Sequence, residues 1–123
     1  MIVLDHTAVV ALCRGHRLLS GLAVVEVDDP LQRAHVPALC LFAASMELPG
    51  AAAHTGALPG LEFLPLDFAG AAAVEQATVA GVDWRHAHAV YASASGQGEA
   101  QVLTATPEAY DGTGVWAVDI GKP

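Results

Sequence analysis

The chain begins with the stretch MIVLDHTAVVAL, residues 1–12, in which a short apolar run ends on an acid and an apolar helical segment follows. The run Ile2–Asp5 is apolar until its last residue, which is typical of a strand buried on both faces of a parallel sheet. Thr7 is in position to cap a helix over Ala8–Arg14. In an open α/β sheet, the carboxyl ends of the strands meet at the ligand site. We therefore expect Asp5 and Thr7 to lie at that edge.

The rest of the chain alternates between further strand and helix patterns. Pro-Gly pairs separate several of these segments, and Asp67 and Asp83 are in position to cap helices. The predicted strands are Ala34–Val36, Leu61–Leu66, Gln101–Leu103 and Val115–Ile120. The predicted helices are His16–Val27, Ala38–Leu48, a segment from Asp67 to Ala80, and Trp84–Ser95, with a loop or short helix between Pro49-Gly50 and Pro59-Gly60 and a turn at Gly96-Gln97-Gly98. Strands separated by helices predict a three-layer α/β/α fold around a mainly parallel sheet of about five strands, in one domain over residues 1–123.

The composition fits a folded domain with a substantial core. Of the 123 residues, 54% are hydrophobic, and the mean hydropathy is +0.45. No apolar stretch reaches membrane-spanning length, and the start lacks the pattern of a signal peptide, so we expect a cytoplasmic protein with no membrane contact. Cys13 and Cys40 have neither metal-site nor disulfide spacing and sit in apolar runs, which predicts core thiols.

The charge of the chain bears on its partners. The net charge is −8, because 13 acids face only 5 lysines and arginines. Nonspecific nucleic-acid binding depends on basic side chains that neutralise phosphates. The charge therefore argues against an autonomous, tight RNA binder, although it is compatible with a weak or metal-bridged encounter.

Asp5 and Thr7 are the first candidates for chemistry. A carboxylate and a hydroxyl at the end of a strand suit a hard divalent cation, held directly or through water. The alternative is that Asp5 accepts backbone N–H groups or interacts with a helix N-terminus.

The segment from Asp83 to Ala89 supplies the second group of candidates. On a helix, Asp83 and His86 lie three residues apart and can face the same way. His86 and His88 point apart, so the two do not predict a two-histidine metal site. The alternative is that Asp83 caps the helix, with one of these histidines buried and the other exposed. The remaining histidines show no ligand spacing: His6, His16, His35 and His54.

The other acids carry no strong signal by themselves. Each fits a solvated surface position as well as a site position: Glu47, Glu62, Asp67, Glu108 and Asp111. The chain also lacks the GxSxG, P-loop and GxGxxG motifs, which removes the usual signatures of serine hydrolases and of nucleotide and dinucleotide binding.

Four short segments together resemble the PIN domain, a metal-dependent nuclease fold. They are VLDHTA (residues 3–8), VPALCLFAA (36–44), AHAV (87–90) and VLTATP (102–107). They look like the family's first strand with its Asp-x-Ser/Thr motif, its proline-started helix, its alanine-rich helix and its strand ending in Thr-Ala-Asp-Pro. The resemblance implies a ribonuclease that uses Mg²⁺ or Mn²⁺, commonly the toxin of a toxin–antitoxin pair. It also implies an RNA substrate, a protein partner such as an antitoxin, and a homodimer.

The resemblance places the family's acids on this sequence one by one. Asp5 falls in register with the first acid. The glutamate expected after the proline is replaced by Ala43, and Glu47 follows one helical turn later. The final aspartate is replaced by Thr106. Because hard cations depend on carboxylate oxygens, the loss of these acids should weaken Mg²⁺ binding.

The family's central aspartate has two candidate positions in this chain. It corresponds to Asp83 or, when the segments are aligned from the last strand, to His86. The resemblance thus implies Asp5 and Asp83 as catalytic residues, and a metal-binding set of Asp5, Thr7, Glu47, Asp83 and Thr106.

Two main functions and a weaker third remain open from the sequence. One is a PIN-like ribonuclease with weak or lost activity, and it requires Asp5, Asp83 and one more carboxylate to approach a common point. The other is a non-catalytic protein-binding or regulatory module, which should expose an apolar patch. Aromatic residues that suit such a patch, or else the core, are Trp84, Tyr91 and Trp116. A weaker third alternative is a small-molecule binder that uses the same strand-end crevice.

Overall fold

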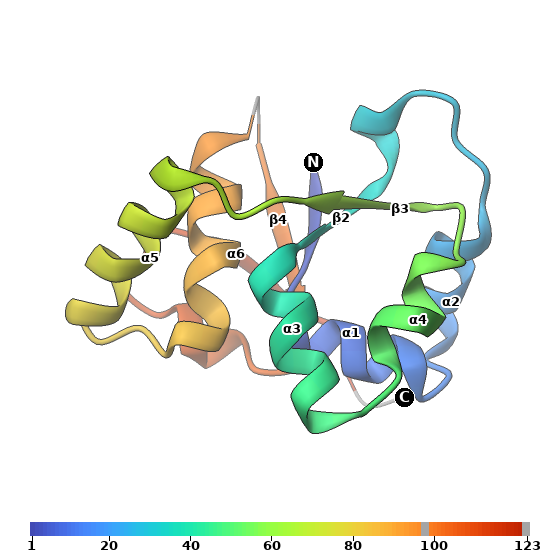
Figure 1. Cartoon of the computed structure of the whole chain (residues 1–123), viewed down its shortest axis with the longest axis horizontal. Helices are drawn as coiled ribbons and strands as arrows, with labels where there is room; N and C mark the ends of the chain where they lie inside the picture. The colour runs from blue at the N-terminus through green and yellow to red at the C-terminus, as the bar shows by residue number, and fades with distance from the viewer. Residues whose placement is uncertain (97–98, 122–123) are drawn as a thin grey trace.

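The computed structural model describes residues 1–96 and 99–121, and these residues build one parallel sheet. Its strand order is β3-β2-β1-β4-β5, and every neighbouring pair is parallel (Figure 1). The strands are β1 (Ile2–Leu4), β2 (Ala34–Pro37), β3 (Leu61–Leu64), β4 (Gln101–Thr104) and β5 (Trp116–Asp119). This arrangement confirms the predicted α/β class and its parallel five-stranded sheet.

Helices connect the strands in the alternating order that the sequence predicts. The α-helices are α1 (His6–Cys13), α2 (Arg17–Val24), α3 (Ala38–Glu47), α4 (Ala51–Gly56), α5 (Phe68–Val79) and α6 (Trp84–Ser95). Two short 3₁₀ helices, η1 (Pro30–Gln32) and η2 (Pro107–Tyr110), lie in the connections. Among the described residues, no helix has the length and apolar character needed to cross a bilayer. The predicted turn at Gly96-Gln97-Gly98 lies partly on residues 97–98, outside the described residues.

The core has two parts because successive side chains of a strand point to opposite faces of the sheet. Leu4 and Leu103 pack in one cluster, which contains residues of α1, α2 and α4. Val3 and Val102 pack in the other cluster, which contains residues of α6. Helix α5 packs on α6, on the side of the molecule away from α2 and α4 (Figure 1). The central strand β1 is therefore covered on both faces, as its apolar sequence predicts.

Two local predictions about helix starts and ends were wrong. Helix α1 begins at His6 rather than Ala8, and its cap is Asp5 rather than Thr7, since Asp5 accepts the backbone N–H of Ala8 at 3.0 Å. The hydroxyl of Thr7 donates to Asp5 instead of capping the helix. Helix α2 ends at Val24, three residues earlier than predicted, because the chain becomes extended at Val25.

The histidines of α6 also differ from expectation, since His86 and His88 are both buried. Helix α6 contacts the sheet and α3 and carries α5 on its outer side, so several of its faces are covered. His88 accepts a hydrogen bond from the backbone N–H of Leu39, which gives this side chain a structural contact with α3. The two cysteines are free, and Cys40 is fully buried as predicted for a core thiol, whereas Cys13 is only partly buried and packs against the core.

Candidate functional site

Asp5 stands at the carboxyl end of β1 and is completely buried. One carboxylate oxygen, Oδ1, accepts the hydroxyl of Thr7 at 2.6 Å and the backbone N–H of Ala8 at 3.0 Å. The other oxygen, Oδ2, accepts the hydroxyl of Tyr110 at 2.7 Å and lies 3.2 Å from Nδ1 of His86. We call Asp5 and these four partners the Asp5 network. A carboxylate offers about four lone-pair positions, and this network uses all of them.

The network keeps Asp5 ionised although it is buried. Burial by itself would raise the pKa of Asp5, but the polar side chains of His86, Thr7, Thr104 and Tyr110 around it outweigh this effect and lower the pKa to about 2. Burial and the neighbouring charge of Asp5 raise the pKa of Tyr110, so its phenol remains a protonated donor. Because a carboxylate only accepts, the contact with His86 requires the imidazole Nδ1 to carry the proton.

A chain of threonines joins this network to the end of β4. The hydroxyls of Thr7 and Thr104 lie 3.1 Å apart, and those of Thr104 and Thr106 lie 3.4 Å apart. The backbone N–H of Ala105 donates to Thr7 at 2.8 Å. Two predicted ligands, Thr7 and Thr106, are thus brought together by Thr104, a buried residue that sequence reasoning did not single out. The signal for it was the polar end of the β4 segment.

Two histidines complete the buried group around Asp5. The rings of His6 and His86 contact edge to face, with centroids 4.6 Å apart. His6 is only 4% exposed, and its Nδ1 atom has no hydrogen-bond partner. One ligand atom each from Asp5, His6 and His86 lies within 4.8 Å of the other two. Sequence reasoning set His6 aside because it has no ligand spacing, and the third member of this group comes from a distant helix.

Asp83 is held in a different way. It caps α6 and forms a two-point contact with Arg85, in which both N···O distances are 3.0 Å. Hydrogen bonds from Arg85 lower the pKa of Asp83 to about 2 although its side chain is exposed. No hydrogen bond or ion pair in the described part of the chain joins Asp83 to Asp5. The side chain that reaches Asp5 from α6 is His86, the other candidate for the central position.

Glu47 lies with Asp83 along an open pocket of about 460 Å³ between α3 and α6. We call this hollow the α3–α6 pocket; its other lining residues are Ala43, Met46, Trp84 and Arg85. No bond from Glu47 to the Asp5 network appears among the described residues. The predicted ligands therefore fall into two groups, with Asp5, Thr7 and Thr106 at the strand ends and Glu47 and Asp83 along the pocket.

An apolar surface adjoins this pocket. Phe42 and Met46 lie one turn apart on α3, and their side chains are 56% and 64% exposed. The ring of Phe42 lies against Trp84 of α6, with centroids 6.4 Å apart. Tyr91, by contrast, stacks on the buried His88. Trp84 is therefore part of an apolar surface, whereas Tyr91 packs against a buried side chain.

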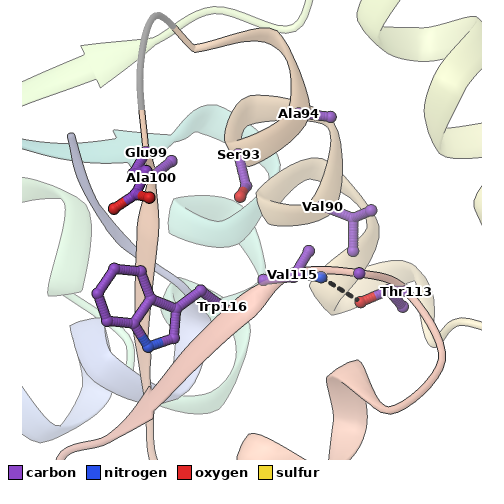
Figure 2. Close-up of a pocket in the computed structure, with 9 residues that line it drawn as sticks. Val90, Ser93, Ala94, Glu99, Ala100, Thr113, Val115 and Trp116 are labelled. Atoms are coloured by element: carbon purple, nitrogen blue, oxygen red, sulfur yellow. Dashed lines mark hydrogen bonds between the residues drawn. The ribbon is translucent and has the colours of Figure 1, made fainter.

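Another hollow, of about 330 Å³, lies beside β4 and β5 (Figure 2). Its walls include Glu99, Thr113 and Trp116, from the segments that enter these strands. The backbone N–H of Val115 donates to Thr113 at its rim. This hollow lies at the amino ends of the strands, whereas ligands of open α/β sheets bind at the carboxyl ends. It is therefore separate from the edge that holds Asp5.

The residues around Asp5 do not fit Mg²⁺ well. Mg²⁺ requires near-octahedral oxygen coordination, whereas this group contains one carboxylate whose two oxygens already accept hydrogen bonds. Its other potential ligands, His6 and His86, are nitrogen donors. Comparisons with protein-family models, curated proteins and solved structures found no match to this chain. The fold and site define an α/β protein with a buried Asp–His–Tyr group at the carboxyl edge of its sheet.

Proposed function

We propose that this chain is a PIN-like domain that acts as a cytoplasmic protein-binding module, with its divalent-metal ribonuclease activity weak or lost. The parallel five-stranded sheet is compatible with such a domain. The resemblance of the four sequence segments supports the assignment to this family. The chemistry of the strand-end edge supports the weak or lost activity.

The observation that carries the proposal is that hydrogen bonds already occupy both carboxylate oxygens of Asp5. Two-metal cleavage of a phosphodiester needs several carboxylates that approach one point and keep oxygens free for the cations. Here the acid at the strand end is buried and accepts hydrogen bonds from Thr7, Ala8 and Tyr110. The carboxylate of Asp83 is engaged by Arg85. A hard cation would have to displace internal donors from one acid and a guanidinium from the other.

The α3–α6 pocket is the surface that we assign to a partner. The exposed side chains of Phe42 and Met46 and the half-buried Trp84 offer an apolar face. Glu47 at this pocket has no hydrogen-bond or ion-pair partner among the described residues, and the whole chain carries a charge of −8. An apolar centre with a charged rim is the usual anatomy of a docking surface. We therefore assign a partner segment that presents aliphatic side chains flanked by lysine or arginine.

The first test is RNA cleavage in Mg²⁺ or Mn²⁺, with Asp5→Asn beside the unmodified chain. We expect both proteins to leave a single-stranded RNA substrate equally intact at millimolar metal. Metal-dependent cleavage that Asp5→Asn abolishes would overturn the proposal and restore the ribonuclease. Cleavage that persists in Asp5→Asn at the same level would identify a contaminating nuclease.

The second test measures docking with a synthetic helical peptide that carries leucines on one face and lysines on the other. Trp116→Phe leaves Trp84 as the only tryptophan, so fluorescence reports on the pocket directly. We expect the peptide to shift this emission and Met46→Glu to abolish the shift. Leu31→Glu is the matched control, because Leu31 is 67% exposed against 64% for Met46 but lies in η1. Equal binding by both variants would remove the α3–α6 pocket as the docking surface.

A further inference from the structure

The buried group formed by Asp5, His6 and His86 has the chemistry of a transition-metal site. It combines two imidazoles with one carboxylate, and a ligand atom of each lies within 4.8 Å of the others. Imidazole suits Zn²⁺ and its neighbours in the first transition row, whereas Mg²⁺ prefers oxygen ligands alone. We propose that this group binds a borderline divalent transition metal, with Zn²⁺ as the first ion to test.

An independent observation at His6 points to a ligand. Its side chain is 96% buried (4% exposed), yet Nδ1 makes no hydrogen bond within the described part of the chain. Buried polar atoms in folded proteins nearly always have a partner, so one without a partner needs an explanation. A metal ion bound in this group would provide that partner.

The spacing of the group is close to that of a bound ion. Zinc–nitrogen and zinc–oxygen bonds of about 2.0 to 2.2 Å set neighbouring tetrahedral ligands about 3.4 Å apart. The rings of His6 and His86 already contact each other, with centroids 4.6 Å apart, and Nδ1 of His86 lies 3.2 Å from Asp5. Only a small closing movement therefore separates this group from a coordination shell.

Most of the Asp5 network can remain in place around such an ion. Thr7 and Ala8 hold one carboxylate oxygen, and Tyr110 donates to the other. Partners of this kind orient a metal-bound carboxylate and are a regular part of metal centres. The contacts that have to yield, when Nδ1 of His86 is the ligand atom, are those of this atom with Asp5 at 3.2 Å and with the hydroxyl of Tyr110 at 3.0 Å. The hydrogen bonds that occupy the oxygens of Asp5 oppose a metal that needs oxygen ligands alone. They are less of an obstacle to a metal that takes two of its ligands from histidine.

The charges near this group come from several elements. The charged groups near His6 are Asp5 beside it, Arg85 on α6 and Glu47 on α3. The carboxylate of Asp5 is therefore the main negative charge available to a cation there. Because Glu47 and Arg85 also line the α3–α6 pocket, that pocket is within electrostatic reach of the proposed site.

The test is Zn²⁺ titration of the chelator-treated, metal-free protein by calorimetry, with Co²⁺ absorption as a second readout. We expect one ion per chain, a rise in Tm with Zn²⁺, and Co²⁺ bands of a nitrogen–oxygen site. His6→Gln and His86→Gln should each weaken Zn²⁺ binding by at least about tenfold. Since the His6 side chain makes no hydrogen bond among the described residues, His6→Gln removes a ligand without breaking a hydrogen bond of the Asp5 network.

His35→Gln is the matched control. His35 is also buried and its Nδ1 also lacks a partner, but it lies on β2 outside the Asp5 group. The His35→Gln variant should bind Zn²⁺ with the same affinity as the unmodified chain. The proposal is overturned by the absence of Zn²⁺ uptake at millimolar metal, or by unchanged affinity in His6→Gln. Displacement of Zn²⁺ by equimolar Mg²⁺ would also overturn the proposal, because such selectivity is expected of a site with oxygen ligands alone.

Discussion

The Asp5 network and the α3–α6 pocket each hold an aspartate whose pKa is about 2, but for different physical reasons. Asp5 is buried and is kept ionised by several hydrogen-bond donors. Asp83 is exposed and is kept ionised by the guanidinium of Arg85. Exposed ion pairs are screened by water and contribute little to stability, whereas removing a partner from a buried charge is costly. The two lowered pKa values therefore differ in origin: that of Asp5 depends on the tertiary fold, whereas that of Asp83 comes from an exposed partner two residues away, whose attraction persists in part in the unfolded chain.

The largest effect expected from this difference is on the stability of two matched variants. Asp5→Asn should lower the free energy of unfolding by about 3 kcal/mol, because it takes a charged acceptor from the buried donors Tyr110 and His86. Asp83→Asn should change it by less than about 1 kcal/mol, because the pair with Arg85 is exposed and asparagine caps helices equally well. Urea unfolding of the metal-free proteins at neutral pH measures both values. Equal losses in the two variants would contradict the distinction.

Lowering the pH should also cost more stability through Asp5 than through Asp83. The folded pKa of Asp5, about 2, lies below its ordinary value of 3.8. The unfolded chain therefore takes up this proton first, so the stabilisation is complete above about pH 5 and is lost as the pH falls towards 2. Each unit of difference between the folded and unfolded pKa corresponds to about 1.4 kcal/mol, so the free energy of unfolding falls by about 2 kcal/mol.

The measurement is the stability gap between the unmodified chain and Asp5→Asn, followed from pH 6 to pH 2. Other acids contribute equally to both proteins, so their titration cancels in the gap. We expect the gap to narrow by about 2 kcal/mol over this range. The gap to Asp83→Asn should narrow less, because Asp83 and Arg85 are only two residues apart and exposed, so part of their attraction also lowers the pKa of Asp83 in the unfolded chain. A constant gap for Asp5→Asn would show that Asp5 keeps its ordinary pKa in the folded protein.

The fold was largely predictable because its signals are local. The apolar run before Asp5 and the turn residues between segments predict strands and helices in alternation, and parallel strands follow from helical connections. The start of α1 was not predictable in the same way. Asp5 and Thr7 are both good cap residues two positions apart, and the choice between them depends on Thr104, the last residue of β4, and on Ala105 after it, which both contact Thr7.

The candidate site was predictable only in part, since Asp5, Thr7 and Thr106 were expected at the strand ends and His86 was one of two candidates for the central position. The position of Asp5 at a strand end is a local property, and the rule for parallel sheets indicates which edge it occupies. Its partners His86 and Tyr110 are 81 and 105 residues away in sequence, so their contacts depend on how α6 and η2 pack. His6 follows Asp5 directly, but its importance depends on the ring of His86 against which it packs.

A smaller effect is expected from a single donor of the Asp5 network. Tyr110→Phe removes the hydroxyl that donates to Asp5 at 2.7 Å and leaves the ring in place. It should lower the free energy of unfolding by about 1.5 kcal/mol, the usual cost for a hydrogen bond to a charged group. It should also raise the pKa of Asp5, since one source of its stabilisation is gone. Urea unfolding and carboxyl NMR measure the two effects.

Tyr91→Phe is the control for that variant. Tyr91 lies on α6 and stacks on His88, and no hydrogen bond of its hydroxyl appears among the described residues. Its replacement should leave both the stability and the pKa of Asp5 unchanged. If Tyr110→Phe behaved in the same way, the phenol would not be needed to hold the buried carboxylate.

The smallest effect on stability is expected at Arg85, whose guanidinium is exposed to solvent. Arg85→Gln should lower the urea midpoint at neutral pH only slightly, because this local pair forms in part in the unfolded chain as well, and it should return the pKa of Asp83 towards its ordinary value of 3.8. Molar salt should raise the pKa of Asp83 in the unmodified chain in the same direction, because the Debye length falls to about 3 Å. The pKa of Asp5 should respond to neither change, since its donors are buried. Carboxyl NMR titration follows both aspartates in one sample, and a pKa of Asp83 that ignored salt would mean that its pair with Arg85 is shielded from water.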